Sequence, residues 1–160
     1  MMKRSVIYLT TLALSALLVC APRAHAKSDC DNVKGTGNTF ATGPATFQGT
    51  ATFKIGGQTQ NASVTTNLLG PPEVGDDGTL HARTSHSFVL EDGSSITTVD
   101  NAVLSPTSTP GLYRLNTRAA ITEGTGAYED ACGRLSIHGT INLVTGEVAW
   151  RFTGRICDCG

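Results

Sequence analysis

The sequence has little charge and few aromatic side chains: 16% of its 160 residues are charged and 6% are Phe, Trp or Tyr. Its 12 basic residues are outnumbered by 13 acidic ones. This balance excludes a strongly basic nucleic-acid-binding protein, because phosphate binding needs clustered Lys and Arg. The hydrophobic content of 39% is too high for a disordered polar chain. The length fits a single domain.

Several enzyme motifs are missing as well. There is no Gly-x-Ser-x-Gly elbow of a serine hydrolase and no His-Glu-x-x-His zinc motif. The segment Gly35-Thr36-Gly37 lacks the third glycine and the following helix of a dinucleotide-binding loop. No window repeats apolar residues at helical spacing, so we expect almost no helix. We therefore expect no cofactor and no metal ion.

The N-terminus has the three-part layout of a secretory signal peptide. A basic start is followed by an apolar run over residues 6–19 and by Ala-His-Ala at residues 24–26. The run is shorter than the roughly 20 residues of a membrane span. We predict a signal peptide over residues 1–26, cleaved after Ala26, and a secreted or periplasmic protein. Lipidation at Cys20 is the alternative, disfavoured because a valine precedes it where Gly, Ala or Ser is required.

Cleavage would leave an acidic chain that is rich in glycine and threonine. Removing residues 1–26 takes away three basic residues, which leaves 9 basic against 13 acidic and a net charge of −4. All 18 glycines and 21 threonines remain in 134 residues. Threonine is β-branched and favours strands, and glycine supplies turns and bulges. This composition predicts an all-β protein.

Alternation of apolar and polar residues predicts seven strands separated by turns rich in Gly, Pro and Asp. They cover residues 45–55, 58–69, 79–90, 94–104, 112–122, 134–143 and 147–157. Seven or eight antiparallel strands in this length form a sandwich or a barrel. We favour an antiparallel β-barrel of about eight strands, because closure removes exposed edges in a chain with few protective lysines. The predicted barrel domain covers residues 44–160, after an N-terminal arm over residues 27–43.

Four cysteines follow the predicted signal peptide, an even number that suggests disulfides in an exported chain. Cys157 and Cys159 are too close to bond to each other easily. We therefore expect Cys30 and Cys132 each to bond to one of them. A metal site is disfavoured because no His has a ligand spacing nearby, and a redox role because the spacing is Cys-x-Cys rather than Cys-x-x-Cys.

The most distinctive pattern lies in residues 123–157. Gly124 to Leu135 matches Gly-Thr-Gly-x-Tyr-x-x-Ala-x-Gly-x-Leu, and Thr153-Gly154-Arg155-Ile156-Cys157 ends the stretch. This region resembles the allene oxide cyclase barrel-like and dirigent-like group of calycin-type barrels, which includes secreted bacterial proteins. The resemblance implies a barrel of about eight strands around an interior cavity that confines a reactive substrate. The motif contains no catalytic residue, so the resemblance transfers no active site.

Four basic side chains are candidates for ligand binding. His81 and Arg83 share one face of their strand, and Arg114 and Arg118 share a face of another. If these faces line the barrel interior, they form a cationic pocket for a carboxylate or a similar head group. A solvated outer face is the simpler interpretation.

Tyr128 and Glu123 flank the Gly-Thr-Gly turn, where a barrel would open. Tyr128 is a candidate for capping this mouth with a packed ring and a wet hydroxyl. Glu123 is a weak candidate for a general acid or base. We expect His86 to be an isolated histidine, facing away from His81, and Asp100 to pair with an Arg across strands.

The sequence thus favours an exported small β-barrel that binds a small apolar or amphipathic molecule. The alternatives are a cyclase-like isomerase that confines a lipid-like substrate, or a structural module with a filled barrel. We lean towards a non-enzyme, expect no nucleic-acid partner and leave a homo-oligomer open. A filled barrel would exclude binding, and catalysis needs at least two ionisable groups converging in the cavity.

Overall fold

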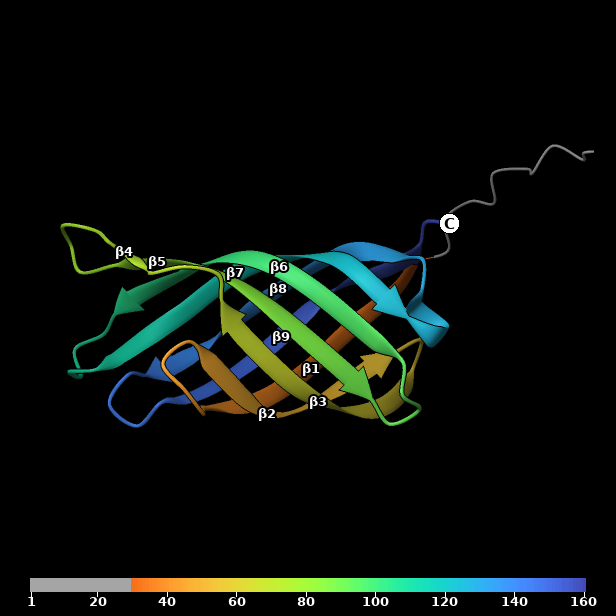
Figure 1. The fold of residues 1–160 in the computed structure, drawn as a ribbon, viewed down its shortest axis with the longest axis horizontal. Helices are drawn as coiled ribbons and strands as arrows, with labels where there is room; N and C mark the ends of the chain where they lie inside the picture. The colour runs from red at the N-terminus through yellow and green to blue at the C-terminus, as the bar shows by residue number, and fades with distance from the viewer. Residues whose placement is uncertain (1–29) are drawn as a thin grey trace, which may run out of the picture.

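The computed structural model describes residues 30–160, which form a closed antiparallel barrel of eight strands and one short extra strand (Figure 1). This confirms the predicted all-β barrel. The predicted signal peptide and Cys20 lie outside the described residues. The elements are β1 (Cys30–Ala41), β2 (Thr46–Ile55), β3 (Gln58–Leu68), β4 (Glu73–Val74), β5 (Leu80–Leu90), β6 (Ser95–Pro106), β7 (Leu112–Thr125), the 3-10 turn η1 (Gly126–Tyr128), β8 (Ala131–Asn142) and β9 (Glu147–Asp158).

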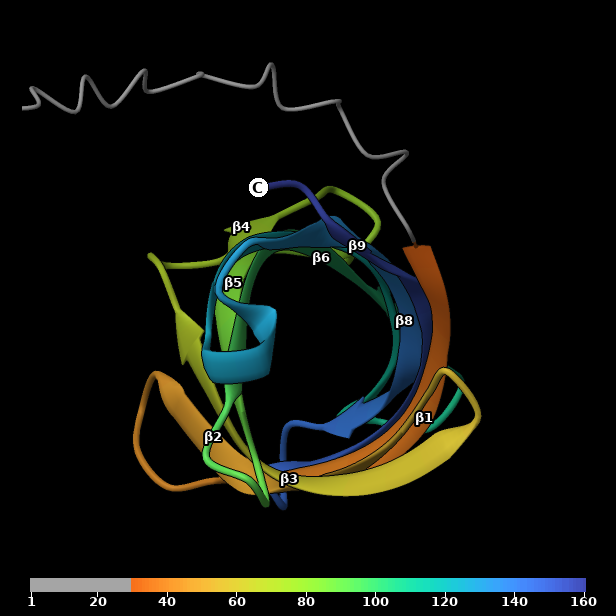
Figure 2. The same ribbon diagram turned by 90° about the vertical axis from the view of Figure 1, so that its right-hand side faces the viewer.

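The barrel closes where β3 pairs with β5. The remaining neighbours follow the order β3-β2-β1-β9-β8-β7-β6-β5, and β4 adds two residues beside the start of β5. The view along the barrel shows a closed ring of strands, with η1 lying across part of one opening (Figure 2). We call this opening the closed end and the opposite opening the mouth. Among residues 30–160, no helix is long and apolar enough to cross a membrane.

The first strand corrects one sequence-based boundary. Residues 27–43 were predicted as an arm outside the barrel, yet residues 30–41 form β1, which pairs with both β2 and β9. Its inward positions include Gly35, Gly37 and Thr39 in place of large apolar side chains. The alternation that marks a half-buried strand is therefore absent from this stretch.

Glycine is required in β1 because two aromatic rings occupy the space beside it. Gly35 lies opposite Phe152, and Gly37 lies opposite Trp150, on the neighbouring strand β9. A Cβ atom at either glycine would overlap the ring of its partner. The rings therefore cover the glycines, a pairing that stabilises strands with missing side chains.

We expect Gly37→Ala to lower the free energy of unfolding by about 1–3 kcal/mol, the usual cost of overpacking a core. The added methyl group would push against the Trp150 ring. Equilibrium unfolding in guanidinium chloride measures the change. Gly43→Ala is the matched control, because nothing lies within 4 Å of its added Cβ. Equal stability of the Gly37 variant and the parent protein would contradict the packing role.

Aromatic side chains fill the middle of the barrel. The ring centroid of Phe53 lies 4.6 Å from that of Phe152 and 5.1 Å from that of Phe88. Trp150 continues the cluster, with its ring centroid 6.1 Å from that of Phe88. All four side chains are buried. The four rings therefore form one packed group within the buried core.

Two disulfides join strands at the closed end. Cys30 is bonded to Cys157, and Cys132 is bonded to Cys159. Each of the two earlier cysteines thus bonds to one member of the C-terminal pair, as the sequence predicts. The first bridge links β1 to β9, and the second links β8 to the residue just after β9.

Candidate functional site

An interior cavity of about 200 Å³ opens towards the mouth. Its walls are mainly apolar and include Phe88 and Trp150 of the aromatic cluster. Six of its lining residues are polar: Thr39, Thr66, Thr84, His86, Asp100 and Thr117. An apolar hollow with a few converging polar groups is the usual form of a small-molecule site. The barrel is therefore not completely filled by its own side chains.

Exposed apolar side chains gather around the mouth. Phe40 is near the end of β1, Leu69 follows β3, and Leu143 and Val144 follow β8. The antiparallel pairing brings these strand ends to the same opening, and all four side chains are at least 47% exposed. Leu143 also lines the cavity. The cavity wall thus continues outwards as an apolar rim.

A carboxylate lies at the polar side of the cavity. Asp100, on β6, is 3% exposed. It accepts hydrogen bonds from the hydroxyl of Thr84 and, at 2.8 Å, from that of Thr117. The ring of His86 lies 3.2 Å away, measured from Nε2 to Oδ2 of Asp100. A buried carboxylate needs such partners, because an unpaired buried charge is very costly.

These partners decide the ionisation of Asp100. Burial raises the pKa of its carboxyl group, but the hydrogen bond and charge of His86 and the hydroxyls of Thr84 and Thr117 outweigh burial, so the net pKa lies below the ordinary value. Asp100 is therefore a carboxylate at neutral pH. Its negative charge sits beside an otherwise apolar hollow.

His86 connects this carboxylate to a second hydroxyl. Its Nδ1 lies 2.8 Å from Oγ1 of Thr66 on β3, on the other side of the ring from Asp100. In the neutral ring, a proton on Nε2 points to Asp100, which leaves Nδ1 as the acceptor for the Thr66 hydroxyl. The result is a chain of carboxylate, imidazole and hydroxyl in the cavity wall. These two contacts hold the ring in one orientation in the cavity wall.

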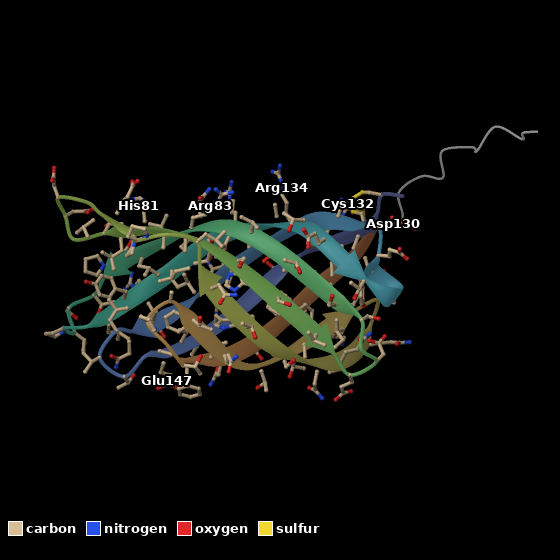
Figure 3. The ribbon with its side chains drawn as sticks, viewed as in Figure 1. His81, Arg83, Asp130, Cys132, Arg134 and Glu147 are labelled. Atoms are coloured by element: carbon tan, nitrogen blue, oxygen red, sulfur yellow. A yellow bond between two sulfur atoms is a disulfide. The ribbon has the colours of Figure 1, made fainter. Side chains whose placement is uncertain are left out.

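The four predicted basic ligand-binding residues lie elsewhere. His81, Arg83, Arg114 and Arg118 are all exposed at positions that alternate with buried ones on β5 and β7. Figure 3 shows His81 and Arg83 pointing away from the barrel. None of the four lines the cavity. These four side chains therefore do not form a cationic pocket inside the barrel, because the inward faces of β5 and β7 carry the apolar core.

The two residues next to the Gly-Thr-Gly turn lie at the closed end. Tyr128, in η1, is half-buried and packs against the core, and this burial raises the pKa of its phenol. It is absent from the cavity wall. Glu123 is exposed on β7, opposite Thr97. Glu123 is likewise absent from the cavity wall.

Sequence reasoning missed His86 and Asp100 as partners. The expected pairing of Asp100 with an Arg is wrong, because Asp100 faces the interior while the arginines face outwards. One signal was present: the alternation in residues 79–90 places His86 on the same face as Phe88 and Leu90. Among residues 30–160, no three His, Cys, Asp or Glu side chains gather as metal ligands.

Comparison with known proteins adds a distant similarity of fold. No family model matches the chain, and no curated protein matches its sequence. Two solved pterocarpan synthase dirigent proteins are similar, each with a TM-score of 0.44 and 10% identity. The match to PsPTS1 covers 82% of this chain and 97% of that one, and the match to GePTS1 covers 94% and 100%. Similarities of this size assign neither family nor activity.

Proposed function

We propose that this protein is an exported β-barrel that binds a small apolar or amphipathic molecule in its interior cavity. The cavity itself is the main support, since it is apolar, opens at the mouth and carries one cluster of polar groups. Export is supported by the N-terminal signal pattern and by two disulfides, which persist in oxidising compartments.

The cavity volume limits the ligand. Its 200 Å³ is below the roughly 300–1,000 Å³ of drug-sized sites and slightly above the ~150 Å³ that encloses benzene. The buried part of the ligand is therefore about one ring or a short branched chain. A polar group of the ligand would contact Thr66 and His86, and a longer tail would extend out of the cavity along the apolar rim. This proposal favours amphipathic molecules over purely aliphatic ones.

Trp150 provides a direct test, because it is the single tryptophan of the chain and lines the cavity. We expect a one-ring alcohol such as benzyl alcohol to change Trp150 fluorescence in a saturable way. Ala102→Leu should weaken this binding about tenfold or more, because Ala102 lines the cavity and the larger side chain takes the ligand's space.

Ala120→Leu is the matched control, since Ala120 is exposed on the outer wall. It should bind the alcohol as the parent protein does. A titration without saturation would contradict the proposed function, as would equal affinity in the Ala102 and Ala120 variants. Mass spectrometry of the native protein from its own host would then identify the natural ligand.

One observation supports a second candidate, a cyclase-like isomerase. Two ionisable groups, Asp100 and His86, converge at the cavity, and their chain to Thr66 could move a proton on a confined substrate. Proton NMR of the ligand before and after incubation separates the two candidates, because isomers have the same mass but different spectra. An isomerase returns a rearranged molecule, whereas a binding protein returns the same one. A purely structural module is disfavoured by the open cavity.

A further inference from the structure

The outer wall of the barrel carries cations that form no ion pair with any other residue of the described range. All eight Lys and Arg residues within the described range 30–160 are exposed on barrel strands. The ion pair found in that range joins His86 to Asp100 inside the barrel. The eight residues are Lys34, Lys54, Arg83, Arg114, Arg118, Arg134, Arg151 and Arg155.

Acidic side chains lie mainly at the ends of the barrel. Apart from buried Asp100, the described acids belong to turns, to β4 or to the first and last few residues of long strands. Figure 3 shows this separation, with Arg83 and Arg134 on the wall and Asp130 and Glu147 towards the two ends. The wall is therefore positive even though the described chain has more acids than bases.

Like charges even face each other on this wall. Arg134 lies directly opposite Arg155, and Lys34 lies directly opposite Lys54. Directly opposed like charges destabilise a sheet. Their presence without acidic neighbours indicates a surface suited to anions.

One part of the wall is hollowed. A shallow, open groove of about 660 Å³ lies over β7, β8 and β9 and reaches Ser105 of β6. Asn116, His138 and Arg151 stand side by side in one cross-strand row. The next row of outward-facing residues consists of Arg114, Thr140 and Ala149. The short side chains of Thr140 and Ala149 leave space for the groove. No acidic residue of the described chain lines this groove.

Arg114 and Arg151 lie at opposite corners of this arrangement. Arg114 and Arg151 are on strands two apart, about 10 Å across the sheet, with His138 on the strand between them. Guanidinium groups bind the oxygens of phosphate, sulfate and carboxylate with paired hydrogen bonds. Asn116 and Thr140 add neutral donors. Two guanidinium side chains and two neutral donors thus line the same groove.

We propose that this groove, bounded by Arg114, His138 and Arg151, is a binding site for a phosphate or sulfate group. The site is on the outer wall and does not depend on ligand binding in the interior cavity. The anion could be free or carried by a polymer, and the surrounding positive wall would favour a polymer with repeated sulfate groups.

The test compares two double variants that remove the same charge. Arg114→Gln with Arg151→Gln removes both guanidinium groups of the groove, and Arg83→Gln with Arg118→Gln removes two from the wall outside it. Calorimetry measures binding of inorganic phosphate, inorganic sulfate and heparin as a sulfated polymer. We expect saturable phosphate or sulfate binding that falls about tenfold or more in the groove variant and less than about twofold in the wall variant.

Three outcomes would overturn the proposal. The first is that no probe binds the parent protein. The second is that both double variants lose affinity equally, which would mean a diffuse attraction to the whole wall. The third is that the groove variant retains full affinity. Heparin binding that is lost in the groove variant alone, without binding of free anions, would support the same site and assign a polymer as its occupant. Thermal unfolding of both variants verifies that they are folded.

Discussion

Replacing both Cys30 and Cys157 with serine is expected to lower the free energy of unfolding by ~4–5 kcal/mol. The bridge joins residues 127 positions apart, so its removal frees a long loop in the unfolded chain, and the chain-entropy cost of such a loop is large. A small domain has a total stability of about 5–15 kcal/mol. We therefore expect the variant to be close to unfolding at 37 °C. Guanidinium unfolding without reductant measures the loss.

The second disulfide serves as the internal comparison. Cys132 and Cys159 are 27 positions apart, and replacing both should cost ~3–4 kcal/mol by the same reasoning. The longer loop should thus show the larger loss, by about 1 kcal/mol. If the shorter bridge proved the more stabilising one, loop entropy would not be the main cause. Mass spectrometry should find both bridges in the parent protein.

A variant with Thr84→Val and Thr117→Val is expected to lose ~3–5 kcal/mol at pH 7. Both hydroxyls donate hydrogen bonds to Asp100. Valine keeps the shape of threonine but removes the donor, so the buried carboxylate keeps only His86. Each hydrogen bond to a charged group contributes about 1.5–3 kcal/mol. Chemical unfolding measures the difference from the parent protein.

Thr98→Val is the matched control in the same barrel interior. Thr98 is fully buried, and its hydroxyl has no hydrogen-bond partner among residues 30–160. Removing an unpaired buried hydroxyl should leave stability unchanged or raise it. A large loss in this control would show that Val for Thr is harmful for reasons of packing, and the result for Asp100 could not then be ascribed to hydrogen bonding.

Acidification should narrow the gap between the parent protein and the Thr84/Thr117 variant. In the parent, the pKa of Asp100 is lowered on folding, so its stabilising contribution is present above an unfolded pKa of about 3.9 and lost as the pH falls through the folded value. The variant lacks two of the hydrogen bonds that lower this pKa, so its Asp100 has a higher pKa than in the parent and loses less stability on acidification. The difference between the two proteins is therefore smaller at about pH 3.5 than at pH 7.

The sequence predicts the barrel well where strands have one apolar face. Residues 80–90 illustrate this, since the expected inward set from Leu80 to Leu90 is the set that faces the interior. The sequence-based prediction fails at β1, because Gly35 and Gly37 have no side chains and aromatic rings from another strand fill the space beside them. Because these rings belong to another strand, the sequence around Gly35 and Gly37 lacks the alternation of apolar and polar residues that would indicate a strand.

The candidate site was harder to predict from the sequence for a related reason. Thr84 and Asp100 lie directly opposite each other, as do Thr66 and His86. Each is an ordinary polar residue within its own strand, and only the pairing register brings them together. The expected disulfide pattern succeeded because it depended on spacing along the chain, which the sequence contains.

The two ends of the barrel differ in what holds their strands together. Two covalent cross-links and η1 secure one end, while four loops, the longest covering residues 69–79, and exposed apolar side chains form the other. Local opening in proteins occurs where buried contacts are fewest. We therefore expect local opening to concentrate at the mouth, where the proposed ligand would enter or leave while the hydrogen bonds between strands at the opposite end stay intact.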